Sequence, residues 1–548
     1  MRVAPFLRQH GGLILIIACW LIPGLLGRTP WKPDEAYTVG LVHHIATTGD
    51  WIVPTLAGEP FMEKPPIFFL LAALMGWAFG GLLPFHDAAR LASALFIGLS
   101  MAALACATHD KTRPGTGRLA VLGLVSSLGL LVHAHQLITD LALMAGIACG
   151  LTGLSLIWRQ PRWAGIWFGT GMGIAFMSKG LLGPGLLGVT AAALPILHAP
   201  ARSRLYLQAM RQAFYAALPW LLIWPIALWL RHPELFAVWA WDNNIGRFLG
   251  LNTLGPKPEP GGYFAILPWF ALPLWPIALW TVWTRRKQLR QDSQLLVPTL
   301  YFVLALAVLS LASDARALYA LPLLPPLVML ITPLYGQERQ PQRLSFALIP
   351  WLLFGLVWVL LVLGWIGLQT GMPALKGPRW LAMRPGFVAQ FELWRPMLAL
   401  LGAVALGWLA RRHWRQGLSG FITSWCSGLA AVWLCFMLLW LPWLEWGSGF
   451  GPLVKQIRAA MPADTRCTTS WHLGEPQRAM FDYYGQFRLH RLEIDGGTNC
   501  DAILVQGHDL PMAITLQRQA WQEIWHGARP GDEKKEPYRL FRRRTSTP

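Results

Sequence analysis

The chain has 548 residues, of which 54% are hydrophobic and only 13% are charged, and its net charge is +19 at pH 7. A soluble domain carries about 25% charged residues, so this composition excludes an ordinary soluble protein and indicates an integral membrane protein. Lys and Arg stand in short clusters between apolar runs, which indicates oriented membrane loops and argues against a nucleic-acid partner.

The N-terminal segment predicts a first membrane span that is retained. Arg2 and Arg8 precede an apolar run at 11–27. A secretory signal peptide would end in a small-residue cleavage site, and none precedes Arg28. The positive-inside rule then puts the N-terminus in the cytoplasm.

Apolar runs that could cross a membrane recur as far as residue 444. They fall at 11–27, 67–82, 88–107, 118–134, 141–158, 163–178, 181–197, 213–230, 264–283, 295–312, 317–335, 345–368, 397–410 and 419–444. Basic clusters recur in every second loop, and the positive-inside rule puts such loops in the cytoplasm. With a cytoplasmic N-terminus, all of these loops are cytoplasmic only if the run 67–82 does not cross the membrane. That run would rise about 24 Å as a helix, short of the ~30 Å hydrocarbon core. The pattern predicts about thirteen spans, with an interfacial or re-entrant helix at 67–82.

The first extracytoplasmic loop carries an unusual density of charge beside the membrane. Asp34 and Glu35 precede apolar residues at helical spacing, so the segment 35–47 is predicted to lie flat on the membrane with its apolar face down. Glu63 and Lys64 follow. Asp34 could simply cap this helix. Ionisable groups held close to lipid are, however, more often functional, which makes this loop the candidate site.

Four further ionisable residues are predicted at the outer ends of spans: Asp140, Lys179, Arg247 and Arg316. Asp140 could serve only the helix dipole, and Lys179 could snorkel to the interface. Arginine at this depth can bind lipid headgroups or one specific phosphate. Together with the first loop they predict an outer-face pocket. Its carboxylates would orient or deprotonate an acceptor hydroxyl, and its cations would stabilise a phosphate leaving group.

The C-terminal region, 446–548, is much more polar than the rest of the chain. It contains a helix-like segment at 451–461 and a strand-like segment at 502–505, which predict a small α/β domain outside the membrane. Cys467 and Cys500 lie in this region. They could form a disulfide if the domain is extracytoplasmic, or could remain two free thiols.

Seven short motifs follow one another along residues 10–445. They are Trp31-x-Pro-Asp34-Glu35, Gly49-Asp50-Trp51-x-x-Pro54, Glu63-Lys64-Pro65, Thr139-Asp140, Ser178-Lys179-Gly180, Gly246-Arg247-Phe248 and Arg316-Ala-Leu-Tyr319-Ala-Leu-Pro322. This order resembles the ArnT-like and protein O-mannosyltransferase-type membrane glycosyltransferases. The resemblance implies a polytopic α-helical GT-C catalytic domain over 1–445, with interfacial helices in the first periplasmic loop at 28–87, followed by a periplasmic α/β domain over 446–548.

The resemblance also implies a role for each matched residue. Asp34 would be the catalytic or acceptor-orienting carboxylate. The other implied residues are Asp140 and Glu35 as further acidic residues of the site, Lys64, Arg247, Lys179 and Arg316 for the donor phosphate, Tyr37, Phe61 and Tyr319 as pocket lining, and Glu63 as a metal ligand, with a divalent metal left open. The chain departs from the aminoarabinose enzymes at Tyr37, Phe61 and Asn244, where those enzymes have Arg, Tyr and in some cases His. The identity of the sugar therefore stays open.

The sequence thus predicts a multi-pass glycosyltransferase of the bacterial inner membrane, surrounded by membrane lipids. It would move a sugar, with inversion, from an undecaprenyl-phosphate carrier to lipid A or to another envelope lipid, glycan or protein. The alternatives are a transporter or flippase for lipids or lipid-linked sugars, and a non-catalytic envelope assembly protein. A transporter would need ionisable residues at mid-membrane, and an assembly protein would not need Asp34, Lys64 and Arg247 to converge.

Overall fold

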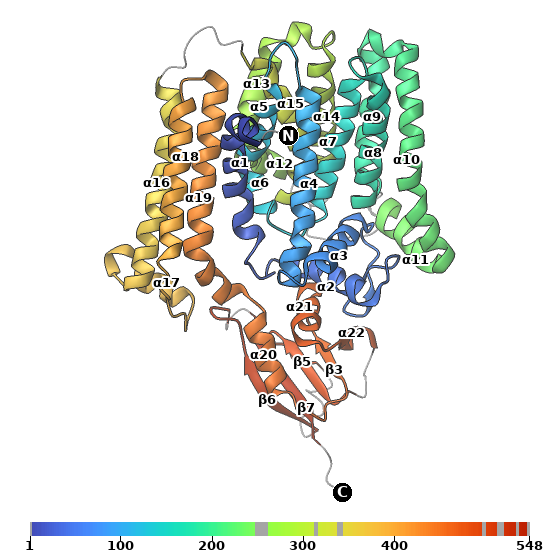
Figure 1. Cartoon of the computed structure of the whole chain (residues 1–548). Coiled ribbons are helices and arrows are strands. Elements are labelled where there is room, and N and C mark those ends of the chain that lie inside the picture. The colour runs from blue at the N-terminus through green and yellow to red at the C-terminus, as the bar shows by residue number, and fades with distance from the viewer. Residues whose placement is uncertain are drawn as a thin grey trace.

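The computed structural model describes residues 3–246, 261–311, 316–336, 344–495, 500–511, 520–532 and 536–544. It has two parts, which Figure 1 shows one below the other. The larger part is a bundle of apolar helices that run roughly side by side. The smaller part is a sheet domain built from the C-terminal residues, and it lies against one end of the bundle.

The bundle is made of helices whose sequences are apolar along most of their length. They are α1 (Val3–Leu25), α4 (Phe85–Thr108), α5 (Thr116–Ser126), α6 (Leu128–His133), α7 (Asp140–Leu156), α8 (Pro161–Lys179), α9 (Leu182–Leu197), α10 (Arg204–Arg231), α11 (Pro233–Ala237), α12 (Gly262–Phe270), α13 (Leu274–Thr284), α14 (Ser293–Leu311), α15 (Leu324–Ile331), α16 (Leu344–Thr370), α17 (Gly377–Met383), α18 (Trp394–His413) and α19 (Gly417–Ser448). The π-helical turn η2 (Val238–Gly246) follows α11, and the 3-10 helix η4 (Ala317–Leu323) precedes α15.

The lengths of these helices identify a multi-pass membrane protein. In the described part of the chain, six helical segments are long and apolar enough to cross a membrane, and seven are if the bent pair α12 and α13 counts as one broken span. Five shorter apolar helices accompany them. The total of about thirteen spans that the charge pattern gives stays a prediction.

The first loop folds into two helices joined by a short hairpin. These are α2 (Pro33–Thr48), β1 (Thr55–Leu56), β2 (Glu59–Pro60) and α3 (Ile67–Phe79). Thirteen residues of helix in α3 rise only about 20 Å, so α3 is too short to cross the ~30 Å core upright. In Figure 1, α2 and α3 lie together at the end of the bundle that faces the sheet domain.

The local sequence explains where α2 begins and ends. Pro33 occupies the first turn, where its missing N–H costs nothing, and Gly49 ends the helix in the left-handed conformation with φ 71°. The prediction of a helix over 35–47 is therefore confirmed. The prediction that its apolar side rests on lipid is wrong, because Val39, Leu41 and other apolar residues of α2 are fully buried within the protein.

The sheet domain packs against α2. Its sheet has the order β4-β3-β5-β7-β6, where β3 pairs in parallel with β4 and β5, and β7 pairs antiparallel with β5 and β6. The elements are α20 (Gly451–Ala460), β3 (Thr468–Trp471), α21 (Glu475–Gly485), β4 (Leu489–Arg491), α22 (Leu492–Asp495), β5 (Ala502–Gln506), β6 (Trp521–Gly527) and β7 (Tyr538–Arg543). This agrees with the predicted small α/β domain.

Helix α21 is the element that joins the two parts. A Cβ atom added to Gly40 of α2 would lie 2.7 Å from the Cβ atom of Ala479 of α21, so the two helices touch through small residues. Beside this contact, Glu59 of the first loop forms ion pairs with Arg478 at 2.8 Å and Arg491 at 3.4 Å. The first loop is thus held between the bundle and the sheet domain.

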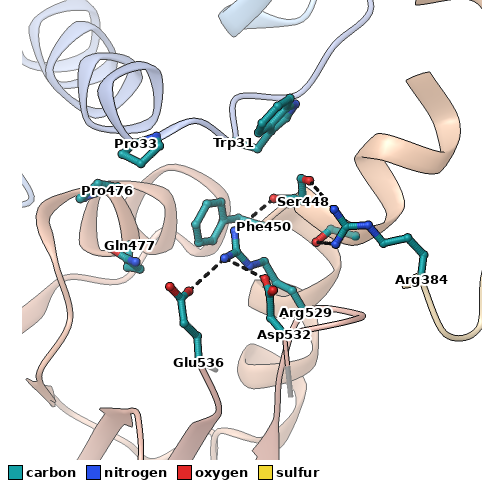
Figure 2. A pocket seen from close by; sticks show the side chains of 11 residues that line it. Trp31, Pro33, Arg384, Ser448, Phe450, Pro476, Gln477, Arg529, Asp532 and Glu536 are labelled. Carbon is teal, nitrogen blue, oxygen red and sulfur yellow. Dashed lines mark hydrogen bonds and ion pairs between the residues drawn. The ribbon is translucent and has the colours of Figure 1, made fainter. Parts of the chain in front are cut away.

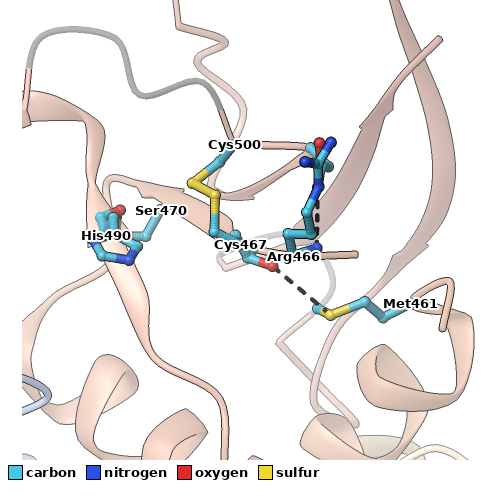
Figure 3. Close-up of a disulfide and its surroundings, with 8 residues drawn as sticks. Met461, Arg466, Cys467, Ser470, His490 and Cys500 are labelled. Carbon is cyan, nitrogen blue, oxygen red and sulfur yellow. Dashed lines mark hydrogen bonds and ion pairs between the residues drawn. A yellow bond between two sulfur atoms is a disulfide. The ribbon is translucent and has the colours of Figure 1, made fainter. Parts of the chain in front are cut away.

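Cys467 and Cys500 form a disulfide, which settles the alternative that the sequence left open. Figure 3 shows the bond at the ends of two neighbouring parallel strands, since Cys467 precedes β3 and Cys500 precedes β5. The bond ties the two strands together at the points where they enter the sheet.

Replacing both bridging cysteines with serine is expected to destabilise the sheet domain by about 2–4 kcal/mol, because the unfolded domain then regains the freedom of the closed loop. Thermal unfolding of the detergent-purified protein measures this. Cys106→Ser is the control, since Cys106 is a free thiol. An unfolding temperature equal to that of the control would show that the bond does not stabilise the domain.

Candidate functional site

Asp34 is the most accessible carboxylate of the candidate site. It is the second residue of α2, where the helix dipole favours a negative charge. Its Oδ1 atom accepts a 3.4 Å hydrogen bond from the Tyr37 hydroxyl and lies 3.8 Å from Nη1 of Arg316. The Asp34 side chain keeps 28% of its surface exposed. The carboxylate is therefore held by two neighbours and still open to a substrate.

Lys64 lies on the other side of Tyr37. Its ammonium donates a hydrogen bond to the Tyr37 oxygen and lies 4.9 Å from the centre of the ring, while Phe61 stacks on that ring at 5.7 Å. Burial opposes the charge of Lys64, but the Tyr37 oxygen and the carboxylates of Asp140 and Glu63 outweigh it and raise the lysine's pKa. Burial raises the pKa of Tyr37 to about 12. At neutral pH the pair is thus an ammonium and a neutral phenol.

A second acid–base pair joins the start of one bundle helix to the end of another. Asp140 is the first residue of α7, and Lys179 is the last residue of α8. The Lys179 Nζ atom lies 2.6 Å from Oδ1 of Asp140 and 3.9 Å from the centre of the Tyr319 ring. Both side chains are almost fully buried, so neither is a snorkelling or merely capping group.

The two pairs belong to one site. The Asp140 carboxylate contributes to the raised pKa of both Tyr37 and Lys64, although it belongs to a different helix. The predicted residues that converge are Asp34, Tyr37, Phe61, Lys64, Asp140, Lys179, Arg316 and Tyr319. The site therefore combines two carboxylates, three cations and the two phenols of Tyr37 and Tyr319.

Gly180 fixes the position of Lys179 at the end of α8. Its backbone, with φ 65° and ψ −136°, lies in a region that residues with a Cβ atom avoid. An added Cβ would also lie 1.8 Å from Oδ1 of Asn244 in η2. The backbone conformation and the close approach of Asn244 therefore explain why the Ser-Lys-Gly motif has glycine at this position.

Gly180→Ala is expected to lower turnover about tenfold or more, because backbone strain of about 1–3 kcal/mol moves Lys179 away from Asp140. Steady-state turnover in the sugar-transfer assay measures this. Gly185→Ala in α9 is the matched control, since a Cβ atom there meets nothing within 4 Å. Equal turnover of both variants would contradict the positioning role.

Glu35 does not point into the site, although the resemblance implied a catalytic role. It is fully buried, with its carboxylate 2.7 Å from Arg28 and 2.8 Å from Arg90. Arg90 also binds Asp87 at 2.6 Å. Burial works against the charge of Glu35, but the two guanidinium groups outweigh it and lower its pKa. This placement makes Glu35 the centre of a buried ion cluster behind the site.

Sequence reasoning missed this ion cluster. Arg28 follows the first span, and Asp87 and Arg90 open α4 one helical turn apart. The three charges beside apolar runs were the available signal, because charge at that depth needs a partner. Arg247, which the resemblance assigns to the donor phosphate, lies outside the described residues.

The surroundings of Glu63 do not fit a metal site. Across the described ranges, no group of three or more His, Cys, Asp or Glu side chains could hold a metal ion. Glu475 of α21 is an acidic neighbour of Glu63, and its pKa is raised by burial and by the Glu63 carboxylate. No step of the chemistry below therefore runs through a metal.

A cavity of about 260 Å³ lies behind the start of α2, where the first loop meets the sheet domain. Figure 2 shows Trp31 and Pro33 facing it from one side and Phe450 and Arg529 from the other. Arg529 is paired with Asp532 at 3.1 Å and with Glu536 at 3.0 Å. The second cation of the lining, Arg384, donates hydrogen bonds to the backbone oxygens of Gly447 at 3.1 Å and Pro530 at 3.2 Å.

Comparisons of sequence find relatives that are named as sugar transferases. No family model matches it. It is 29% identical over 343 residues to undecaprenyl phosphate-alpha-4-amino-4-deoxy-L-arabinose arabinosyl transferase 1 of Sodalis glossinidius. This match covers 59% of this chain and 58% of that protein. It is 28% identical over 449 residues to the corresponding transferase of Pseudomonas aeruginosa strain UCBPP-PA14, covering 79% of this chain and 75% of that protein. The chain thus spans less than two thirds of the first of these relatives.

A solved structure shares the fold over nearly the whole chain. ArnT from Cupriavidus metallidurans, crystallised with undecaprenyl phosphate, superposes with a TM-score of 0.72 at 16% sequence identity. The match covers 98% of this chain and 99% of that one. The same enzyme in its apo state gives a TM-score of 0.71 at 15% identity, with 97% and 98% covered.

Proposed function

Because the chain is related in sequence and in fold to the ArnT-like membrane glycosyltransferases, we propose that it transfers a sugar from an undecaprenyl-phosphate carrier to an acceptor at the periplasmic face of the inner membrane. The acceptor is lipid A or another envelope lipid, glycan or protein. The observation that carries the proposal is the gathering of Asp34, Asp140, Lys64, Lys179 and Arg316 around Tyr37.

The cations of the site suit the donor phosphate. When the bond between the sugar and the phosphate breaks, negative charge grows on the phosphate. Cations that are already in place stabilise this charge without the reorganisation that solvent would need. Lys64 and Lys179 are both buried, so their attraction for a phosphate is screened little by water. Arg316 is more exposed and lies beside Asp34, where it can contact the phosphate from the open side.

Asp34 suits the acceptor. Its exposed carboxylate can accept a hydrogen bond from the acceptor hydroxyl and take the proton as the new bond forms. The Tyr37 hydroxyl and the Arg316 guanidinium keep the carboxylate in place. Attack by an acceptor oxygen on the sugar, opposite to the departing phosphate, needs no covalent enzyme intermediate and inverts the configuration of the sugar.

Lys64→Ala is expected to weaken donor binding about tenfold to a hundredfold, because an ammonium that contacts the donor phosphate is lost, and to leave acceptor binding nearly unchanged. The donor KM, in an assay where KM reports binding, measures the effect. Lys32→Ala serves as a control, since Lys32 belongs to the same loop and stacks on Trp31 instead. A donor KM equal to that of the control would remove the phosphate role of Lys64.

The proposed topology has about thirteen spans, a cytoplasmic N-terminus and a periplasmic sheet domain. Two observations support it: the basic clusters in alternate loops, and the disulfide of the sheet domain, since disulfides persist in the periplasm and not in the cytoplasm. The proposed catalytic domain spans 1–445 and the periplasmic domain spans 446–548. The contact of α21 with α2 makes the second part a support of the first loop.

The substrate identities follow from comparing cells with and without the protein. Mass spectrometry of envelope glycolipids and glycoproteins should show one sugar mass that is absent without the protein, and the molecule that lacks it is the acceptor. The relatives named above act with 4-amino-4-deoxy-L-arabinose, and Tyr37, Phe61 and Asn244 leave the sugar of this chain open. Identical envelope profiles in the two strains would contradict the proposed function.

A further inference from the structure

A second cavity lies at the surface of the helix bundle, away from the first loop. It has a volume of about 240 Å³ and is formed by α16, α18 and α19, which stand together at one edge of the bundle in Figure 1. Its walls are mainly apolar and include Trp351, Phe354 and Leu406. None of the residues of the candidate site lines it.

The position of this cavity along the helices puts it in the half of the membrane opposite the sheet domain. Its residues come from the first half of α16, the second half of α18 and the first half of α19. The helices α18 and α19 meet at that end, where Arg411, Arg412 and Arg415 are exposed. A cationic rim thus stands at the membrane surface above an apolar cavity.

Two hydroxyl groups in the wall have no hydrogen-bond partner. Ser424 and Ser427 of α19 both line the cavity, and they are 3% and 1% exposed. Among the described residues, neither hydroxyl oxygen has a partner. Serine in a membrane helix commonly bonds to a carbonyl of the preceding turn, as Thr423 does to Ser419. The rest of the wall is mainly apolar, so it offers a water molecule few further hydrogen-bond partners.

We propose that this cavity binds one acyl chain of an anionic glycerophospholipid, with the ester oxygens of the lipid accepting hydrogen bonds from Ser424 and Ser427. Ser427 lies ten residues, or about 15 Å of helix, below the start of α19 and is the deeper of the two. Ser424 lies seven residues, or about 10 Å, below that start, and its depth fits. That is a few ångströms below the headgroup layer, which is about 5–8 Å thick on each side of the membrane. The arginines at the rim hold the phosphate of the headgroup.

The chemistry separates this occupant from the carrier lipid of the proposed reaction. A polyprenyl chain has no carbonyl oxygen, so it cannot satisfy the two hydroxyls. A phospholipid whose chains are joined by ether bonds matches the shape and charge of the diester lipid but lacks its carbonyl oxygens. The inference concerns a lipid site and does not rest on the proposed transfer reaction.

Native mass spectrometry of the detergent-purified full chain tests the site with three probes: diester phosphatidylglycerol, its diether analogue of equal chain length, and undecaprenyl phosphate. The diester lipid is expected to be retained at least fivefold more tightly than the diether, which is the effect of one net hydrogen bond. Ser424→Ala combined with Ser427→Ala should abolish that difference. Ala403→Phe, which fills the cavity, should reduce binding of both lipids.

The control is Val404→Phe, because Val404 is the next residue of α18 and is 62% exposed on the outer surface of the bundle. It should retain lipid as the unchanged protein does. Equal retention of the diester and diether lipids by the unchanged protein would overturn the proposal. The proposal would also be overturned if Ala403→Phe bound as much phospholipid as Val404→Phe does. It would likewise be overturned if Ala403→Phe lost binding of undecaprenyl phosphate alone. The double serine variant keeps the test valid if Ala403→Phe fails to fold, since it removes only two oxygen atoms.

Discussion

Asp34→Asn is expected to lower the rate of sugar transfer by about 10²–10⁴-fold while leaving the fold intact. The amide can still accept a hydrogen bond from the Tyr37 hydroxyl and occupies nearly the same space. It cannot take a proton from the acceptor hydroxyl. The helix that carries residue 34 keeps its buried face and its contact with the sheet domain, so the protein should purify and unfold as before.

Turnover and thermal unfolding of the same preparation measure the two halves of this prediction. Glu392→Gln is a suitable control, because that carboxylate is exposed and pairs only locally with Trp394 and Arg395. The control should keep both turnover and stability. Near-normal turnover by Asp34→Asn would remove the central assignment of the site, whereas a joint loss of turnover and stability would make Asp34 structural.

Glu35→Ala is expected to do the opposite of Asp34→Asn, although the two residues are adjacent. Removing the Glu35 carboxylate takes from the buried guanidinium groups of Arg28 and Arg90 the acid that binds both of them, while Asp87 stays paired with Arg90. An uncompensated buried charge costs about 3–5 kcal/mol. The variant should therefore unfold at a much lower temperature, and activity should fall because less folded enzyme remains.

The pH dependence of stability gives this prediction a second measurement. The two arginines depress the pKa of Glu35 in the folded protein, so its stabilising contribution is complete above the unfolded value of about 4.3 and is lost as the pH falls toward the lower folded value. The contribution should be absent from Glu35→Ala. A Glu35→Ala variant that is as stable as the unchanged protein but inactive would instead indicate that Glu35 takes part in catalysis.

The sequence predicted the site better than it predicted what surrounds it. Asp34, Lys64, Asp140 and Lys179 were assigned from motifs spread over about 150 residues, and the structure brings them together. Their convergence has a physical reason, because each is an ionisable residue next to an apolar run and such a residue favours a polar pocket. The roles assigned to them stay predictions. Glu35 satisfied the same pattern, and only the fold separates it from Asp34.

The apolar side of α2 illustrates what local pattern cannot decide. Apolar residues at helical spacing predict a buried face, and that face is buried. The pattern does not distinguish lipid from protein as the covering material, since both are apolar. One partner of α2 is α21, more than 400 residues later in the chain, and the small residues Gly40 and Ala479 that let the two helices touch carry no signal that links them.

The central claim is that this chain moves a sugar off a polyprenyl phosphate by means of Asp34. The most direct test adds the purified protein to an envelope-lipid extract that contains the lipid-linked sugars, and follows carrier and acceptor masses by mass spectrometry. The unchanged protein should convert one sugar-linked carrier into free undecaprenyl phosphate while the acceptor gains the same sugar mass, and Asp34→Asn should do neither. An unchanged carrier pool with the wild-type protein, or equal conversion by both proteins, would contradict the account.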